Sequence, residues 1–140
     1  MKAYLTRRYR FSASHRLHSA AMSEAENRAT YGKCNNPHGH GHNYALEVTV
    51  SGPVDQRTGM VCNLVELDSF VEREVLERFH LENLNLREEF SAVVPTTENL
   101  STAIYEILQR GFRQAHLEKV RMEETMLNSF EYAGETGMMV

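Results

Sequence analysis

The chain has 140 residues, 41% of them hydrophobic and 24% charged, with a formal net charge of -4. This length fits a single domain spanning residues 1–140, and the composition is that of an ordinary globular protein rather than a disordered or fibrous one. The 15 basic and 19 acidic residues are interspersed, which argues against a nucleic acid as partner.

The first predicted element is a strand from Tyr4 to Ser14. Here apolar residues alternate with polar ones in the period of two that is typical of a half-buried strand, and Tyr9, Phe11 and Ala13 form one face. His15 continues the same face. We therefore expect its side chain to point in the same direction as the apolar ones.

A short helix, a loop and a second strand follow. Ser23 and Glu26 have the spacing of a capping box, which predicts a helix start. The segment from Gly32 to Gly41 is rich in Asn, Pro and Gly and is expected to be a loop. The clearest period-two alternation runs from Tyr44 to Ser51, and Gly52 with Pro53 ends this strand.

Two longer helices are predicted in the second half of the chain. Asn63 is the expected cap of a helix from about Leu64 to Arg78, in which apolar residues recur at helical spacing. A further helix, capped by Thr96 or Thr97, is expected to run to about Gln114.

Two short strands, near Lys119–Thr125 and Ser129–Ala133, end the predicted fold, and the tail 137–140 is expected to fray. Two strands, then helices, then a hairpin predict the α+β class with an antiparallel sheet covered by helices on one side. With only Cys34 and Cys62, and no apolar run of membrane-spanning length, we expect a cytoplasmic protein without disulfides or membrane contact.

Three of the seven histidines can converge on one point. His40 and His42 lie two residues apart, so on an extended chain their side chains share a face, and the flanking Gly39 and Gly41 let the backbone approach a ligand. His15 ends the other long strand. Three histidines with an open fourth position are the pattern of catalytic zinc, so we predict a zinc site.

The fourth position of this site has two candidates, Cys34 and His38. A bound Cys34 thiolate would make a closed structural site, whereas a free Cys34 beside the metal could carry protons. The spacing of these residues does not choose between the two.

Five blocks of the sequence resemble the 6-pyruvoyltetrahydropterin synthase family, in the family's order and across residues 9 to 134. The blocks are FSASHRL at 11–17, YGKCNNP at 31–37, GHGHNY at 39–44, TGMV at 58–61 and PTTEN at 95–99. The resemblance implies a zinc-dependent lyase that converts 7,8-dihydroneopterin triphosphate to 6-pyruvoyltetrahydropterin and eliminates triphosphate, which Mg²⁺ could accompany.

The same resemblance assigns roles to individual residues. It implies that His15, His40 and His42 bind zinc and that Cys34 is the proton acceptor. It also implies that Glu124 binds the amino-pyrimidine edge of the pterin, for which a carboxylate is well suited.

Three further residues, Thr96, Thr97 and Glu98, resemble the family's second ring-binding element, although helix capping would explain one threonine without a ligand. Glu123, next to Glu124, is expected on the opposite strand face.

A further segment of the sequence departs from the family pattern. Near residues 78–85 the family usually has Leu-Asp-His, but the aspartate is absent here in either alignment register. We expect His80 to act as the proton relay near Cys34 without that carboxylate.

The family fold implies a tunnelling-fold subunit with a four-stranded antiparallel sheet. Three subunits would close their sheets into a barrel, and two trimers would stack as a homohexamer with active sites between subunits. Two alternatives are the related 6-carboxytetrahydropterin synthase, which usually has a shorter loop between its cysteine and paired histidines, and a zinc-stabilised pterin-binding protein of low activity.

Overall fold

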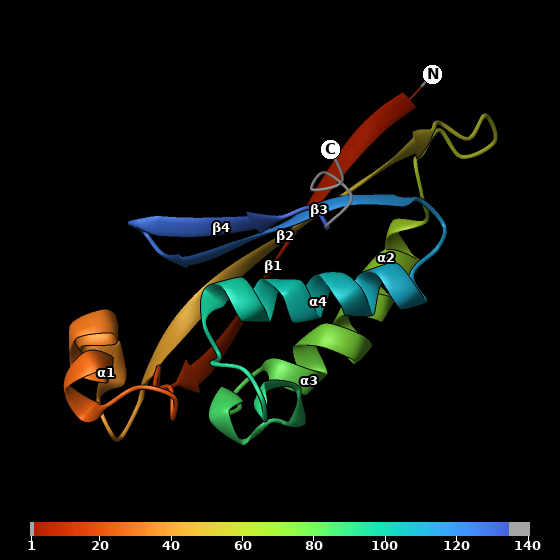
Figure 1. Ribbon diagram of the computed structural model, residues 1–140. Coiled ribbons are helices and arrows are strands. Elements are labelled where there is room, and N and C mark those ends of the chain that lie inside the picture. The colour runs from red at the N-terminus through yellow and green to blue at the C-terminus, as the bar shows by residue number, and fades with distance from the viewer. Residues whose placement is uncertain (1, 135–140) are drawn as a thin grey trace.

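The computed structural model describes residues 2–134 and contains one four-stranded antiparallel sheet in the order β1-β2-β3-β4 (Figure 1). The strands are β1 (Lys2–His15), β2 (His40–Pro53), β3 (His116–Thr125) and β4 (Asn128–Tyr132). The α-helices are α1 (Glu24–Tyr31), α2 (Leu64–Val71), α3 (Glu77–Phe79) and α4 (Thr97–Gly111). Four other helical segments are the 3-10 turns Gly32–Asn35, Leu84–Leu86 and Glu88–Phe90 and the π-helical segment Glu72–Leu76.

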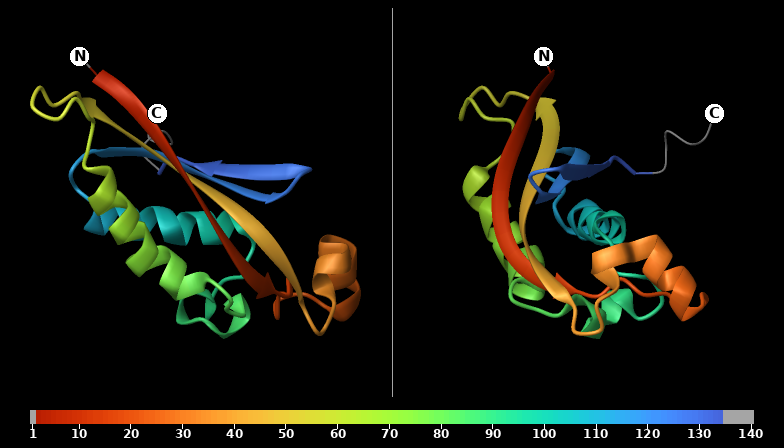
Figure 2. Two further views of the ribbon diagram at one scale, coloured as in Figure 1. Left: turned by 180° about the vertical axis from the view of Figure 1, so that it is seen from behind. Right: turned by 90° about the vertical axis from the view of Figure 1, so that its left-hand side faces the viewer.

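The two longest strands are paired along their whole length. Their register runs from Lys2 opposite Pro53 to His15 opposite His40. Figure 2 shows that these strands extend from α1 at one end of the molecule to the turn after β2 at the other end. The end of β1 and the start of β2 therefore lie side by side, next to α1.

The core lies between one face of this sheet and the helices α2, α3 and α4, as the alternation of apolar residues predicted (Figure 1). Leu67, Ile104 and Leu46, from α2, α4 and β2, are fully buried in it. Burying each such side chain stabilises the fold by roughly 1.5–3 kcal/mol. On the opposite, polar face the Glu47 carboxylate pairs with Arg8 at 2.8 Å and with Arg121 at 3.3 Å. The α+β class and the antiparallel sheet with helices on one side are confirmed.

Helix caps follow the sequence closely. Ser23 and Glu26 form the predicted capping box, and Asn63 accepts a hydrogen bond from the backbone N–H of Glu66. Thr96, rather than Thr97, caps α4 by accepting from the N–H of Asn99. None of the helices within residues 2–134 combines the length and apolar character that a membrane span requires.

Element boundaries differ from the prediction in several places. The helix predicted from Leu64 to Arg78 contains the π-helical segment 72–76, and α4 ends at Gly111 rather than near Gln114. The predicted loop 32–41 contains a 3-10 turn, and β2 already begins at His40. The tail 137–140, expected to fray, lies outside the described residues.

Candidate metal centre and active site

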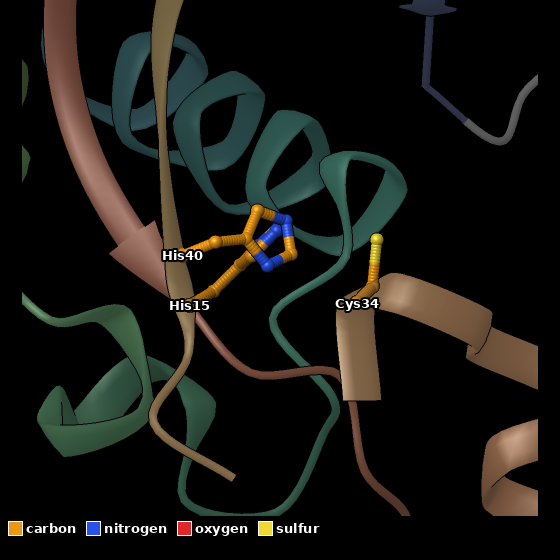
Figure 3. Close-up of side chains that lie close together, drawn as sticks. All are labelled: His15, Cys34 and His40. Carbon is orange, nitrogen blue, oxygen red and sulfur yellow. The ribbon is translucent and has the colours of Figure 1, made fainter. Parts of the chain in front are cut away.

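Three histidine side chains converge where β1 ends and β2 begins. The register places His15 opposite His40 and Ala13 opposite His42, so all three imidazoles lie on the helix-covered face. Their ring centroids are 4.7 to 5.0 Å apart, and each pair of rings meets edge to face. The Nε2 atoms of His40 and His42 are 2.9 Å apart. Figure 3 shows His15 and His40 extending from neighbouring strands toward one point.

A hydrogen bond fixes the orientation of the His15 ring. The side chain is 1% exposed, and its Nδ1 lies 2.8 Å from the carbonyl oxygen of Pro95. A carbonyl only accepts, so Nδ1 carries the proton and Nε2 presents its lone pair to the cluster. Among the described residues, His15 Nε2 has no hydrogen-bond partner although it is buried. Such an orphaned nitrogen fits a metal ligand.

The backbone before His40 approaches the end of β1 closely. Gly39 has φ of 73°, in the left-handed region, and a Cβ placed there would lie 3.0 Å from the backbone oxygen of His15. Glycine therefore allows the turn that aims His40 at His15.

Burial sets the protonation state of the cluster. It lowers the pKa of His15, against the opposing effect of the hydrogen bond to Pro95, and it lowers the pKa of His42, against the charge of Glu124. A lowered pKa favours the neutral imidazole, which is the form that binds a metal.

Cys34 lies beside the histidines in the 3-10 turn Gly32–Asn35 (Figure 3). Its sulfur and the nearest ring nitrogens of His15 and His40 all lie within 4.8 Å of one another. Burial raises the pKa of the Cys34 thiol, and the charge of Glu124 adds to the effect. His38, the other candidate for the fourth position, is exposed and belongs to neither group of candidate metal ligands in residues 2–134.

Glu124 reaches the cluster from the end of β3. One carboxylate oxygen lies 3.3 Å from Nε2 of His42 and 3.7 Å from Nε2 of His15, while the other accepts from the Asn128 amide at 3.0 Å. Glu123 is paired with Ala45 on the polar face of the sheet. The two neighbouring glutamates thus lie on opposite faces, as strand alternation predicted, and only Glu124 can take part in chemistry at the histidines.

The cap and first turn of α4 place the three predicted ring-binding residues in different environments. Thr96 is occupied as the helix cap, whereas the hydroxyl of Thr97 is buried and has no partner among the described residues. Glu98 is exposed in the first turn of α4. Of the three, Thr97 therefore has a buried hydroxyl that a ligand could use, whereas the Glu98 carboxylate lies at the surface.

His80 does not lie beside Cys34 within one chain. Its exposed side chain follows α3 and accepts the backbone N–H of Ser12 at 3.1 Å. The chain from Leu81 to Asn83 continues along the outer edge of β1, where the N–H of Leu81 donates to the oxygen of Ser12. Among the described residues no contact joins His80 to Cys34 or to the three histidines.

Two features of the site were missed by the sequence analysis. The contact of His15 with the carbonyl of Pro95 involves a backbone group, so no residue type in the sequence predicts it. Tyr44 is fully buried, with its hydroxyl 3.5 Å from His15 Nδ1, and burial raises its pKa. Its position two residues after His42 on a strand was the signal that could have placed it on the same face.

The chain is similar to known proteins along nearly its whole length. The family model described as 6-pyruvoyl tetrahydropterin synthase matches residues 4–135. The chain is 47% identical to 6-pyruvoyl tetrahydrobiopterin synthase of Drosophila melanogaster over 134 residues, which is 94% of this chain and 80% of that protein. The solved structure of Caenorhabditis elegans 6-pyruvoyl tetrahydropterin synthase superposes with a TM-score of 0.91 at 41% identity and covers 96% of both chains.

The alternative relative is more distant. A putative 6-carboxy-5,6,7,8-tetrahydropterin synthase of Archaeoglobus fulgidus is 33% identical and covers 76% of this chain and 84% of that protein. The similarity to the pyruvoyl-type enzymes is both higher and longer. The chain belongs to the 6-pyruvoyl tetrahydropterin synthase family.

Proposed function

We propose that this lyase converts 7,8-dihydroneopterin triphosphate to 6-pyruvoyltetrahydropterin at a zinc ion bound by His15, His40 and His42. The observation that carries the proposal is the buried Nε2 of His15, which has no hydrogen-bond partner within residues 2–134 and whose ring is fixed by Pro95. The donor set also fits zinc, because three neutral imidazoles with an open fourth position are typical of catalytic zinc sites. When bound, zinc would act as a Lewis acid toward the oxygens of the substrate side chain and would favour the thiolate of Cys34.

Cys34 is the proposed proton acceptor. In the elimination, the base takes a proton from a side-chain carbon, and the electron pair of the C–H bond forms a double bond. The C–O bond to triphosphate breaks, and its electron pair leaves with the triphosphate oxygen. The enol that results becomes a carbonyl, and the two hydrogens that the remaining side-chain carbinol loses in becoming a carbonyl reduce the N5=C6 bond of the ring, so no outside reductant is needed. Cys34 lies close enough to His15 and His40 to accept a proton from a substrate bound at the histidines.

Glu124 and Thr97 are the proposed contacts to the pterin ring. A carboxylate accepts two parallel N–H bonds from a guanidine-like edge, and the side chain of Glu124 is only 13% exposed. The buried, unpartnered hydroxyl of Thr97 lies two residues from Pro95, which contacts His15. Thr96 and Glu98 are the other two residues that, by the resemblance to the family, would contribute to binding the pterin ring.

His80 is proposed to relay protons between subunits rather than within one chain. It lies at the outer edge of β1, and β1 and β4 are the two edges of the sheet that a closed barrel would join. We propose a homohexamer, built as a dimer of trimers, in which His80 of one chain serves Cys34 of another. Both cysteines are free, which supports the cytoplasmic location expected from the sequence.

The product of the reaction tests this function. Zinc-loaded protein should be incubated with 7,8-dihydroneopterin triphosphate, and the products identified by mass spectrometry. We expect 6-pyruvoyltetrahydropterin and inorganic triphosphate. A 6-carboxy product would favour the related synthase. Binding without turnover would favour a pterin-binding protein, for which the missing aspartate near His80 is the one supporting observation.

A further inference from the structure

A basic cavity opens between α1 and the loops on either side of the histidine cluster. Its volume is about 480 Å³. Arg16 lies on the loop after β1, Arg28 on α1 and Lys33 on the 3-10 turn, so three separate segments bring a positive side chain to one concavity. His18 also lines it, and Glu24 is its acidic residue.

The positive charge of this cavity is not neutralised by the described residues 2–134. Arg16, Arg28 and Lys33 against Glu24 leave an excess of two positive charges, in a chain whose net charge is -4. Within residues 2–134, the side chains of Arg28 and Lys33 form no ion pair or hydrogen bond. Arg16 is held by one bond from its Nε to the Asn35 oxygen at 3.1 Å. Unpaired cations in a concavity attract anions.

The cavity adjoins the candidate active site. Arg16 and Pro37 line both this cavity and a smaller one of about 260 Å³, which His15 and Gly39 line as well. Lys33 immediately precedes Cys34 in the same 3-10 turn. Two of the three cations are thus neighbours, along the chain, of candidate site residues, Arg16 of His15 and Lys33 of Cys34.

We propose that this cavity binds the triphosphate group of the substrate, with Arg16, Arg28 and Lys33 as its ligands; the assignment of the ligand rests on the proposed function. Guanidinium groups pair with phosphate oxygens through two parallel N–H bonds, and an ammonium group adds a point charge. These cations also stabilise the negative charge that grows on the triphosphate oxygen as the C–O bond breaks. Arg28 would then distinguish the triphosphate substrate from unphosphorylated pterins.

The test compares Arg28→Gln, Lys33→Gln and the double variant with Arg57→Gln, a control in the turn at the other end of β2 (Figure 2). Binding of inorganic tripolyphosphate to the zinc-loaded protein is measured by calorimetry, together with KM for the substrate. Hydrogen bonds to charged groups are strong enough that each variant should raise the dissociation constant of tripolyphosphate and the KM for the substrate about 10-fold or more. Binding of unphosphorylated 7,8-dihydroneopterin, zinc content and the control should not change.

Several outcomes decide the proposal. Arg28→Lys should recover part of the tripolyphosphate affinity, which a merely structural role would not predict. Unchanged tripolyphosphate binding in the double variant would overturn the site. Tripolyphosphate inhibition that does not compete with substrate would assign the cavity to a separate anion and overturn the substrate role. Arg28-dependent binding in a protein that does not turn over the substrate would instead count against the proposed function and leave the anion site standing.

Discussion

The Nδ1 atom of His15 lies 2.8 Å from the carbonyl oxygen of Pro95, which joins the end of β1 to the residue before the cap of α4. Because the carbonyl can only accept, it fixes the tautomer and the rotation of the imidazole. The same segment carries Thr97. The proposed metal ligand and the proposed ring contact are therefore positioned by one short stretch of chain.

Replacing His40 by Ala should remove zinc and activity, because the two remaining imidazoles hold zinc only weakly. Cys34→Ala should lose activity but retain about one zinc per chain by elemental analysis. His116→Ala, at an exposed histidine on β3, is the matched control and should retain both. If Cys34→Ala loses its zinc, Cys34 is a metal ligand and not the proton acceptor.

Glu124→Gln should weaken pterin binding far more than Glu123→Gln, since only Glu124 shares the face of the histidines. Losing one partner of a buried, charged hydrogen-bonded pair costs about 2 to 5 kcal/mol. Titration of the zinc-loaded proteins with 7,8-dihydroneopterin measures the difference, with zinc content determined alongside. Equal dissociation constants for the two variants would remove Glu124 from the ring site.

His80→Ala should lower the turnover rate by roughly two to four decades, the usual scale for a general acid or base, and leave the zinc content unchanged. A turnover rate equal to that of the parent protein would show that His80 is not the relay.

Co-expression tests whether the relay crosses a subunit boundary. Alone, Cys34→Ala chains should be inactive, and His80→Ala chains should have only the residual rate expected above. In mixed oligomers about a quarter of the sites would combine an intact Cys34 with an intact His80 from another chain, and activity should return to that extent. Failure to recover activity in mixed oligomers would place the relay elsewhere.

Asp68→Asn should destabilise the fold at pH 7 but not at low pH. Hydrogen bonds from Arg7, at 2.8 and 3.0 Å, and then from the Tyr9 hydroxyl hold the pKa of Asp68 below its usual value. The contribution of Asp68 to the free energy of unfolding is fully present above its pKa in the unfolded chain, about 3.9. This contribution is lost as the pH falls through the lower pKa of the folded state. Urea denaturation at pH 7 and at lower pH measures the difference. Glu77→Gln, at an exposed glutamate, is the control, and an equal effect of Asp68→Asn at every pH would contradict the prediction.

Much of the fold could be predicted because the information is local. The alternation around Phe11 and Val48 defines both long strands, and the Ser23 capping box defines the start of α1. The π-helical segment 72–76 could not be predicted, since no local signal in those residues distinguishes it from an α-helix. Likewise, the segment after α3 follows the edge of β1 through backbone hydrogen bonds, so the place of His80 depends on tertiary pairing.

The convergence of the candidate site residues could be predicted where residue type and strand period suffice. His15, His40 and His42 share a face because strand side chains alternate, and Glu124 differs from Glu123 for the same reason. The contact between Glu124 and the histidines joins residues more than eighty positions apart, and only the sheet order brings them together.

Because the register places His15 opposite His40, a bound ion would link the last residue of β1 to the first residue of β2. Unfolded chains do not hold these side chains together, so zinc would bind the folded form almost exclusively. Each tenfold rise in free zinc above the dissociation constant would then add about 1.4 kcal/mol to the free energy of unfolding. The supply of zinc in the cell would govern how long each molecule survives proteolysis, in addition to whether it can react.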